Sequence, residues 1–185
     1  MESLIAVLVG IGLSAASGLR IFIPFLGLSI AGHYQVIPLT ESFAWLATWQ
    51  AMVAFGVASL LEISAYYIPW LDHALDVILA PAAALAGTLL TASTIGDISP
   101  LMKWSLAIVA GGGISSLVHV GSSALRAAVS LPTGGLANPL VSSTEGIGSI
   151  ALTLLALFMP ILAFFVVVWL MYRGIKQLMR NSTNT

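Results

Sequence analysis

The sequence predicts an all-helical integral membrane protein with about five membrane segments. Of its 185 residues, 59% are hydrophobic and 7% are charged, and the mean hydropathy is +1.05. Soluble domains carry about 25% charged residues, so this chain has too few charges to cover a surface facing water. Several stretches also reach the roughly 20 apolar residues that a spanning helix requires. We therefore expect one polytopic domain over residues 1–185, with the lipid bilayer as its solvent.

The predicted segments follow one another with short connections. They cover about residues 4–31, 43–68, 75–95, 101–131 and 147–172, and a tail follows at 173–185. The first and fourth are longer than a simple span requires, and both are rich in glycine and serine near their centres. Glycine weakens a helix, and serine can bond backbone groups that a break sets free. We expect these two segments to be broken or re-entrant; tilted continuous helices are the alternative.

One arginine lies in each of these two segments, within similar tetrapeptides. These are Ser17-Gly18-Leu19-Arg20 and Ser123-Ala124-Leu125-Arg126. The match predicts a weak internal repeat, and repeats with interrupted helices are a common design of transporters. The second half has one segment fewer than the first, so the predicted symmetry is incomplete.

The charges near the C-terminus predict the orientation. Arg173, Lys176 and Arg180 follow the last segment, and Trp169 and Tyr172 suit the aromatic belt of a membrane interface. Because cytoplasmic loops carry the excess of basic residues, we expect a cytoplasmic C-terminus. We also expect the protein to lie in the inner membrane of a bacterium. Five spans would then place the N-terminus outside.

The composition also excludes classes of function. The net charge is −1, so the protein lacks the excess of basic residues that is typical of nucleic-acid-binding proteins. We therefore expect no nucleic acid as a partner. The chain has no cysteine, which removes disulfides, thiol chemistry and thiolate metal sites. No metal-ligand spacing or catalytic motif is apparent, so the sequence predicts no metal, no cofactor and no enzyme.

The two arginines are the leading candidates for a binding site. A guanidinium keeps its proton, and placing one at membrane depth costs several kcal/mol. As functional residues, Arg20 and Arg126 would bind an anionic group, with Ser17, Ser123 and Asn138 beside them. As structural residues, they would instead satisfy carbonyl groups freed at helix breaks.

Four acids are candidates for balancing charge or carrying a proton. Glu62 lies alone within an apolar segment, where it is either an ion-pair partner of an arginine or a coupling site. Asp72 and Asp76 are four residues apart, which suits either a shared cation or the favourable first turn of a helix. Glu145 follows Ser142 with capping-box spacing, so that region is either a loop with a helix cap or an inward-dipping part of the site.

Four elements together resemble the membrane family known as domain of unknown function 4126. They are Gly12-Leu13-Ser14-Ala15-Ala16-Ser17-Gly18-Leu19-Arg20 with Pro24; Glu62 with Ile68-Pro69, Asp72 and Asp76; Ala124-Leu125-Arg126; and Asn138-Pro139 with Ser142-Ser143 and Glu145. The resemblance implies a membrane fold and these site positions, and it supplies no substrate. One departure is that Gly146 follows Glu145, where the resemblance implies a pair of acids.

These observations favour a small transporter or channel-like protein for an anionic solute or a lipid headgroup. Arg20 and Arg126 would contact the anion, and Glu62 would balance charge or carry a proton. We expect a homo-oligomer, because five helices enclose little volume. A non-catalytic scaffold or assembly factor with structural charges is the alternative, and a lipid-modifying enzyme is the weakest one because no nucleophile and base are paired.

Overall fold

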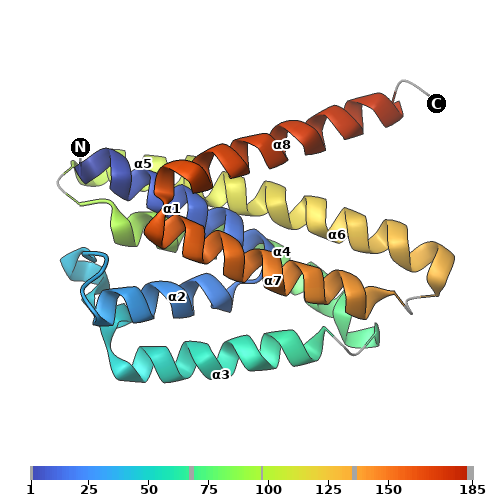
Figure 1. The fold of residues 1–185 in the computed structure, drawn as a ribbon, viewed down its shortest axis with the longest axis horizontal. Helices are drawn as coiled ribbons and strands as arrows, with labels where there is room; N and C mark the ends of the chain where they lie inside the picture. The colour runs from blue at the N-terminus through green and yellow to red at the C-terminus, as the bar shows by residue number, and fades with distance from the viewer. Residues whose placement is uncertain (1, 67–68, 97, 135–136, 183–185) are drawn as a thin grey trace.

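The computed structural model describes residues 2–66, 69–96, 98–134 and 137–182, and it is helical throughout these ranges apart from short connections (Figure 1). The helices are α1 (Glu2–Leu19), α2 (Phe22–His33), the 3-10 helix η1 (Glu41–Ala47), α3 (Trp49–Ala65), α4 (Pro69–Thr94), α5 (Pro100–Leu106), the π-helix η2 (Ala107–Gly112), α6 (Gly113–Thr133), α7 (Asn138–Phe158) and α8 (Pro160–Ser182). No strand occurs within the described ranges, which confirms the all-helical prediction.

The first predicted segment is a helical hairpin, α1 and α2, with Arg20 at its tip. Both arms lie along the later part of α7, where Gly12 approaches Ala156 and Gly27 approaches Thr153. The tip reaches the earlier part of the same helix, because Arg20 bonds Ser142. Figure 1 accordingly shows α2 running back toward the end of the molecule that holds the N-terminus. The prediction that 4–31 is interrupted is therefore confirmed.

The fourth predicted segment is continuous, and the expectation of a break there is wrong. The described helix runs from Pro100 to Ser130 over 31 residues, and its glycine-rich part adopts the π-helix η2. A π-helical turn absorbs an extra residue while the helix continues. The glycines serve packing instead, because the backbone of Gly111 lies against Gly87 and Thr91 of α4, where a side chain would not fit.

The last predicted segment, 147–172, joins parts of two helices, so its prediction as one span is also wrong. α7 ends at Phe158, and Met159 has φ −139° and ψ 61°, outside the helical region. Pro160 then begins α8; a proline lacks the N–H that would continue the preceding helix. Figure 1 shows α8 turning back from this corner, so the two chain ends lie at opposite ends of the bundle.

The remaining segments match the prediction more closely. Predicted segment 43–68 corresponds to η1 and α3, which meet at an angle of 66° next to Thr48, the N-cap of α3. Predicted segment 75–95 corresponds to α4, which begins earlier, at Pro69.

Two described helices are long and apolar enough to cross a membrane. They are Pro100–Ser130 and Asn138–Phe158, and the bent pair of η1 and α3 would make a third. Four further apolar helices are shorter, namely Ser3–Leu19, Phe22–His33, Ile78–Thr94 and Pro160–Gly174. The chain therefore has the helices of a membrane protein, with an arrangement that differs from five simple spans.

The interior of the bundle is rich in hydroxyl groups. Ser14 donates to the carbonyl of Gly87 in α4 at 2.8 Å, and Ser17 hydrogen-bonds Ser115 of α6 at 2.9 Å. Ser115 in turn donates to the carbonyl of Ala83 at 2.7 Å, so three helices share one buried polar seam. Large apolar side chains instead face outward, including Leu60, Leu61, Leu101, Leu140 and Ile147. Small and polar residues inside with large apolar ones outside suit helices that pack in lipid.

The two arginine tetrapeptides have different structures. Arg20 follows the last residue of α1, at a break between helices, whereas Arg126 lies inside the continuous helix α6. The predicted internal repeat therefore receives no support from the local structure at its two defining points.

Replacing Gly87 by alanine should destabilise the protein, because the added Cβ would collide with the Gly111 carbonyl where α4 meets η2. Overpacking of this kind costs about 1–3 kcal/mol, so we expect a lower thermal unfolding midpoint in detergent micelles. Gly121→Ala in α6 is the matched control, because nothing lies within 4 Å of a Cβ added there. Equal midpoints for the two variants would contradict this packing.

Candidate functional site

The Glu145 carboxylate lies between two buried guanidiniums. Its Oε2 is 3.3 Å from Nη2 of Arg20 and 3.4 Å from Nη1 of Arg126. The three side chains are 0–5% exposed. The hydroxyl of Ser122, one turn before Arg126, donates to the other carboxylate oxygen. This ion triad joins the tip of the α1–α2 hairpin to α6 and α7, so the structure brings together three of the residues that the sequence singled out.

An aromatic ring lies beside the same two arginines. The guanidinium carbon of Arg20 is 3.7 Å from the ring centroid of Tyr66, and that of Arg126 is 4.6 Å from it. Tyr66 is buried at the C-terminal end of α3. A cation over an aromatic face is attracted by the ring quadrupole, more strongly where water is excluded. The ring therefore adds to the attraction of the single carboxylate in holding two like charges close together.

Arg20 retains hydrogen-bonding capacity in this cluster. Its Nη2 donates to the carbonyl of Ser142 at 3.1 Å and to the hydroxyl of Ser142 at 2.5 Å. Its Nε and Nη1 are buried and have no hydrogen-bond partner among the residues that the structure describes. A guanidinium carries five N–H groups, and a buried charged donor that lacks a partner is costly. These two donors are therefore the part of the Arg20 guanidinium that the described residues leave without an acceptor.

Glu62 holds the tip of the hairpin through the backbone. Its two carboxylate oxygens accept the N–H groups of Ile21, at 2.8 Å, and of Phe22, at 3.1 Å. The first N–H groups of a helix have no intrahelical partner and favour a negative charge, so a carboxylate from α3 caps α2. The sequence predicted an ion pair with an arginine as one role for this residue. The described ion pairs of both arginines go to Glu145 instead, while Arg20 still acts on Glu62 through a longer coulombic interaction.

The polar residues predicted beside the arginines take different positions. The hydroxyl of Ser123 accepts a long hydrogen bond from Arg126, at 3.4 Å. Asn138 is buried at the start of α7, where its Oδ1 accepts a hydrogen bond from Ser130 at 2.5 Å. Ser17 lies one turn before the tip and bonds Ser115, so it supports the hairpin rather than the guanidiniums.

Two predicted acids cannot be placed in the site. The backbone of Asp72 and Asp76 belongs to α4, but their side chains lie outside the part of the chain that the structure describes. Their proposed role in charge coupling stays a prediction.

Sequence reasoning missed Tyr66 and Ser122 and gave Ser142 a different role. The signal for the first two was helical spacing, since Tyr66 follows Glu62 by four residues and Ser122 precedes Arg126 by four. Ser142 and Glu145 lie inside α7, which begins at Asn138, so they form no cap for that helix. Their spacing of three instead places both on the face of α7 that meets Arg20.

The cluster gathers several charged groups in the interior of the bundle. Two guanidiniums, two carboxylates and an aromatic ring meet at a helix break, away from the exposed surface. Within the described residues, no group of three or more His, Cys, Asp or Glu side chains could hold a metal ion. A buried arginine with free donors is suited to an anion, because guanidinium N–H groups bind oxyanions in a forked geometry.

Fold and site together define a small all-helical protein in which two described helices are long and apolar enough to cross a membrane and the interior carries a charged cluster. Sequence comparison gives the family. The chain belongs to the family described as Domain of unknown function (DUF4126), which matches residues 7–177 and so covers nearly the whole chain. This confirms the resemblance in the sequence. No curated protein and no solved structure matches the chain.

Replacing Glu145 by glutamine should strongly destabilise the fold, because it leaves both guanidiniums without their shared carboxylate. Breaking a buried ion pair on one side costs about 3–5 kcal/mol. Thermal and denaturant unfolding in micelles measure the loss. Glu41→Gln is the control, because Glu41 is exposed in η1 and should change little. A stable Glu145→Gln protein would show that the triad does not hold these helices together.

Substitutions of Glu62 should act on the hairpin tip. Glu62→Gln keeps one acceptor oxygen for the backbone of Ile21 or Phe22, whereas Glu62→Ala keeps none. Loss of a helix cap costs about 0.5–2 kcal/mol, so alanine should be the more damaging change. Hydrogen exchange of the amides of α2 should accelerate in Glu62→Ala first. Unchanged exchange in both variants would contradict a capping role.

Proposed function

We propose that this protein is a small integral membrane transporter or channel-like protein that binds an anion at Arg20 and Arg126. The observation that carries the proposal is the set of free, fully buried donors on Arg20, at the tip of a helical hairpin. A buried cation is costly in any membrane protein and marks a substrate or ion pathway by default.

The proposed membrane location rests on the exposed apolar side chains of the helices and on helix length. Leu60 and Leu61 of α3, Leu101 of α5 and Leu140 of α7 are all more than 60% exposed. The 18 residues of α1 extend about 27 Å and the 12 residues of α2 about 18 Å, both less than the roughly 30 Å of a hydrocarbon core. In this arrangement the α1–α2 hairpin is a re-entrant element that enters and leaves from one side.

We place the protein in the inner membrane of a bacterium, with a cytoplasmic C-terminus. Arg173 and Lys176 of α8 lie beside the rings of Trp169 and Tyr172, at 4.9 Å and 5.9 Å from the ring centroids. Aromatic residues next to basic ones are typical of the cytoplasmic interface.

Glu145 occupies the position that an incoming anion would take. Its carboxylate meets both guanidiniums from within the protein, as a tethered anion does. A small oxyanion, or the phosphate of a lipid headgroup, offers the same oxygen atoms to the same N–H groups and to the free Nε and Nη1 of Arg20. Exchange between the internal carboxylate and the external anion gives a simple mechanism for binding and release.

The charges of the cluster favour a proton as companion of the anion. The described side chains there include the guanidiniums of Arg20 and Arg126, the carboxylates of Glu62 and Glu145, and the buried imidazole of His119 near Glu62. A bound anion adds a negative charge in a low-dielectric interior, which favours protonation of a carboxylate or of the imidazole. Because coupling between two ligands is reciprocal, protons should in turn strengthen anion binding.

A non-catalytic scaffold is the second candidate, and one observation favours it. Every member of the ion triad also ties one helix to another, since Arg20 bonds Ser142 of α7 and Arg126 of α6 pairs with Glu145 of α7. In that role the charges would be structural alone. Association of several copies fits either role.

Arginine-to-lysine substitutions separate the two candidates, because lysine keeps the charge and loses the forked donors. We expect Arg20→Lys and Arg126→Lys to lower the flux of the transported anion by roughly tenfold or more, as one lost charged hydrogen bond predicts. The assay uses purified protein in liposomes with chloride, formate, sulfate and inorganic phosphate, and it records proton uptake with an internal pH dye.

Arg173→Lys in the exposed part of α8 is the matched control and should leave the flux unchanged. Equal flux in folded wild type, Arg20→Lys and Arg126→Lys would refute the site. If the wild type moves none of the anions faster than protein-free liposomes do, the scaffold becomes the better reading.

A further inference from the structure

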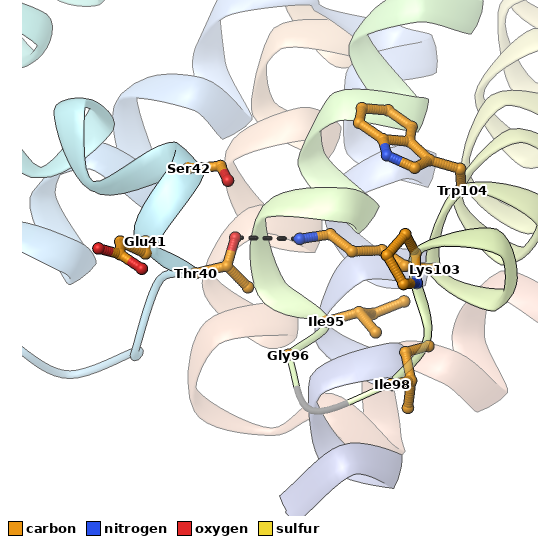
Figure 2. A pocket seen from close by; sticks show the side chains of 9 residues that line it. Thr40, Glu41, Ser42, Ile95, Gly96, Ile98, Lys103 and Trp104 are labelled. Carbon is orange, nitrogen blue, oxygen red and sulfur yellow. Dashed lines mark hydrogen bonds between the residues drawn. The ribbon is translucent and has the colours of Figure 1, made fainter.

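A second polar site lies far from the arginines, at the junction of α4, α5 and the segment before η1. A cavity of about 410 Å³ opens there (Figure 2). Its polar lining includes Thr40, Glu41 and Lys103, and its apolar lining includes Ile95, Ile98 and Trp104. Its volume lies within the range of about 300–1,000 Å³ that is usual for sites of small molecules.

The contacts of α4 place the two sites at different depths. Ala83 of α4 lies level with Ser115 and hence with Ser17, one turn from Arg20. Ile95, in the cavity wall, follows Ala83 by twelve residues, which corresponds to about 18 Å along a helix. The cavity is therefore at one end of the bundle, whereas the arginine cluster is deep in the interior of the bundle.

Exposed aromatic side chains surround this end of the bundle. Tyr34 follows α2, Trp45 and Trp49 lie in η1 and at the start of α3, and Trp104 belongs to the cavity wall itself. Tryptophan and tyrosine gather at the headgroup level of a bilayer, where one end of the ring is apolar and the other is wet. The cavity thus has the depth of lipid headgroups.

Among the lining side chains that the structure describes, Lys103 carries a positive charge and Glu41 a negative one. Nζ of Lys103 donates to the hydroxyl of Thr40 at 3.2 Å, which uses one of the three N–H groups of the ammonium. Figure 2 shows the lysine reaching across to Thr40, with the carboxylate of Glu41 on the far side of that threonine. An ammonium and a carboxylate on opposite sides of one threonine complement a zwitterion better than a simple anion.

We propose that this cavity binds the phosphoethanolamine headgroup of a membrane phospholipid. Lys103 and Thr40 bind the phosphate, Glu41 binds the ammonium of the lipid, and Trp104, Ile95 and Ile98 contact the apolar part near the glycerol. The proposal rests on the membrane location of the protein and is independent of the anion site at Arg20.

Native mass spectrometry of the full chain tests this proposal. The protein is released from mixed micelles that hold equal amounts of phosphatidylethanolamine, phosphatidylglycerol and phosphatidylcholine. We expect the wild type to retain phosphatidylethanolamine preferentially and Lys103→Gln to retain roughly tenfold less, because a charged hydrogen bond is lost. Lys103→Arg should restore retention, and Glu41→Gln should shift the preference toward phosphatidylglycerol.

Lys176→Gln is the matched control, because this lysine also lies near an aromatic ring, that of Tyr172, but outside the cavity. Equal lipid retention by wild type and Lys103→Gln, or equal losses in Lys103→Gln and Lys176→Gln, would overturn the proposal. Displacement of the lipid by inorganic phosphate as readily as by soluble phosphoethanolamine would also overturn it, in favour of a free phosphate site. Anion flux of Lys103→Gln, measured in parallel, should equal that of the wild type, so a failure of either site is recognised separately.

Discussion

The attraction of one carboxylate for two guanidiniums is the interaction on which this structure depends. Glu145 meets both Arg20 and Arg126 through the same oxygen atom, and without it two cations would face each other in an interior that excludes water. The positions of three elements follow from it: the hairpin tip, α6 and α7 are all anchored at this atom. Tyr66 extends the anchorage to α3, because its ring lies against both guanidiniums.

Other contacts in the bundle hold the break between α1 and α2 next to this cluster. Glu62 supplies the acceptors that the backbone of α2 lacks at its first turn. The hydroxyls of Ser14 and Ser17 hold α1 against α4 and α6, and close packing at Gly87 and Gly111 brings those two helices near enough. Polar contacts and small residues thus join these helices, as in helices that associate in lipid, where the hydrophobic effect contributes little.

Much of the candidate site was predictable, because a charge within an apolar stretch is conspicuous at any position. Arg20, Arg126 and Glu62 were found in this way, whereas Glu145 was singled out by its spacing from Ser142. Their pairing was not, since periodicity carries no information about contacts between distant helices. The interruption of 4–31 was predicted from its glycines and serines, yet similar residues in 101–131 form a continuous π-bulged helix packed on α4. The corner at Pro160 was missed because apolar residues on both sides concealed it, although proline was a local signal for it.

The hairpin has a consequence for the order in which its contacts can form while the chain is being synthesised. Arg20 and its partner Ser142 are 122 positions apart, and the carboxylate of Glu145 is synthesised later still. During synthesis Arg20 therefore lacks its ion-pair partner until α7 has left the ribosome, and of the partners described above only those on α3 and its C-cap Tyr66 are made earlier. The contacts of α1 and α2 with α7 can therefore form only after the helices between them in the sequence have been made.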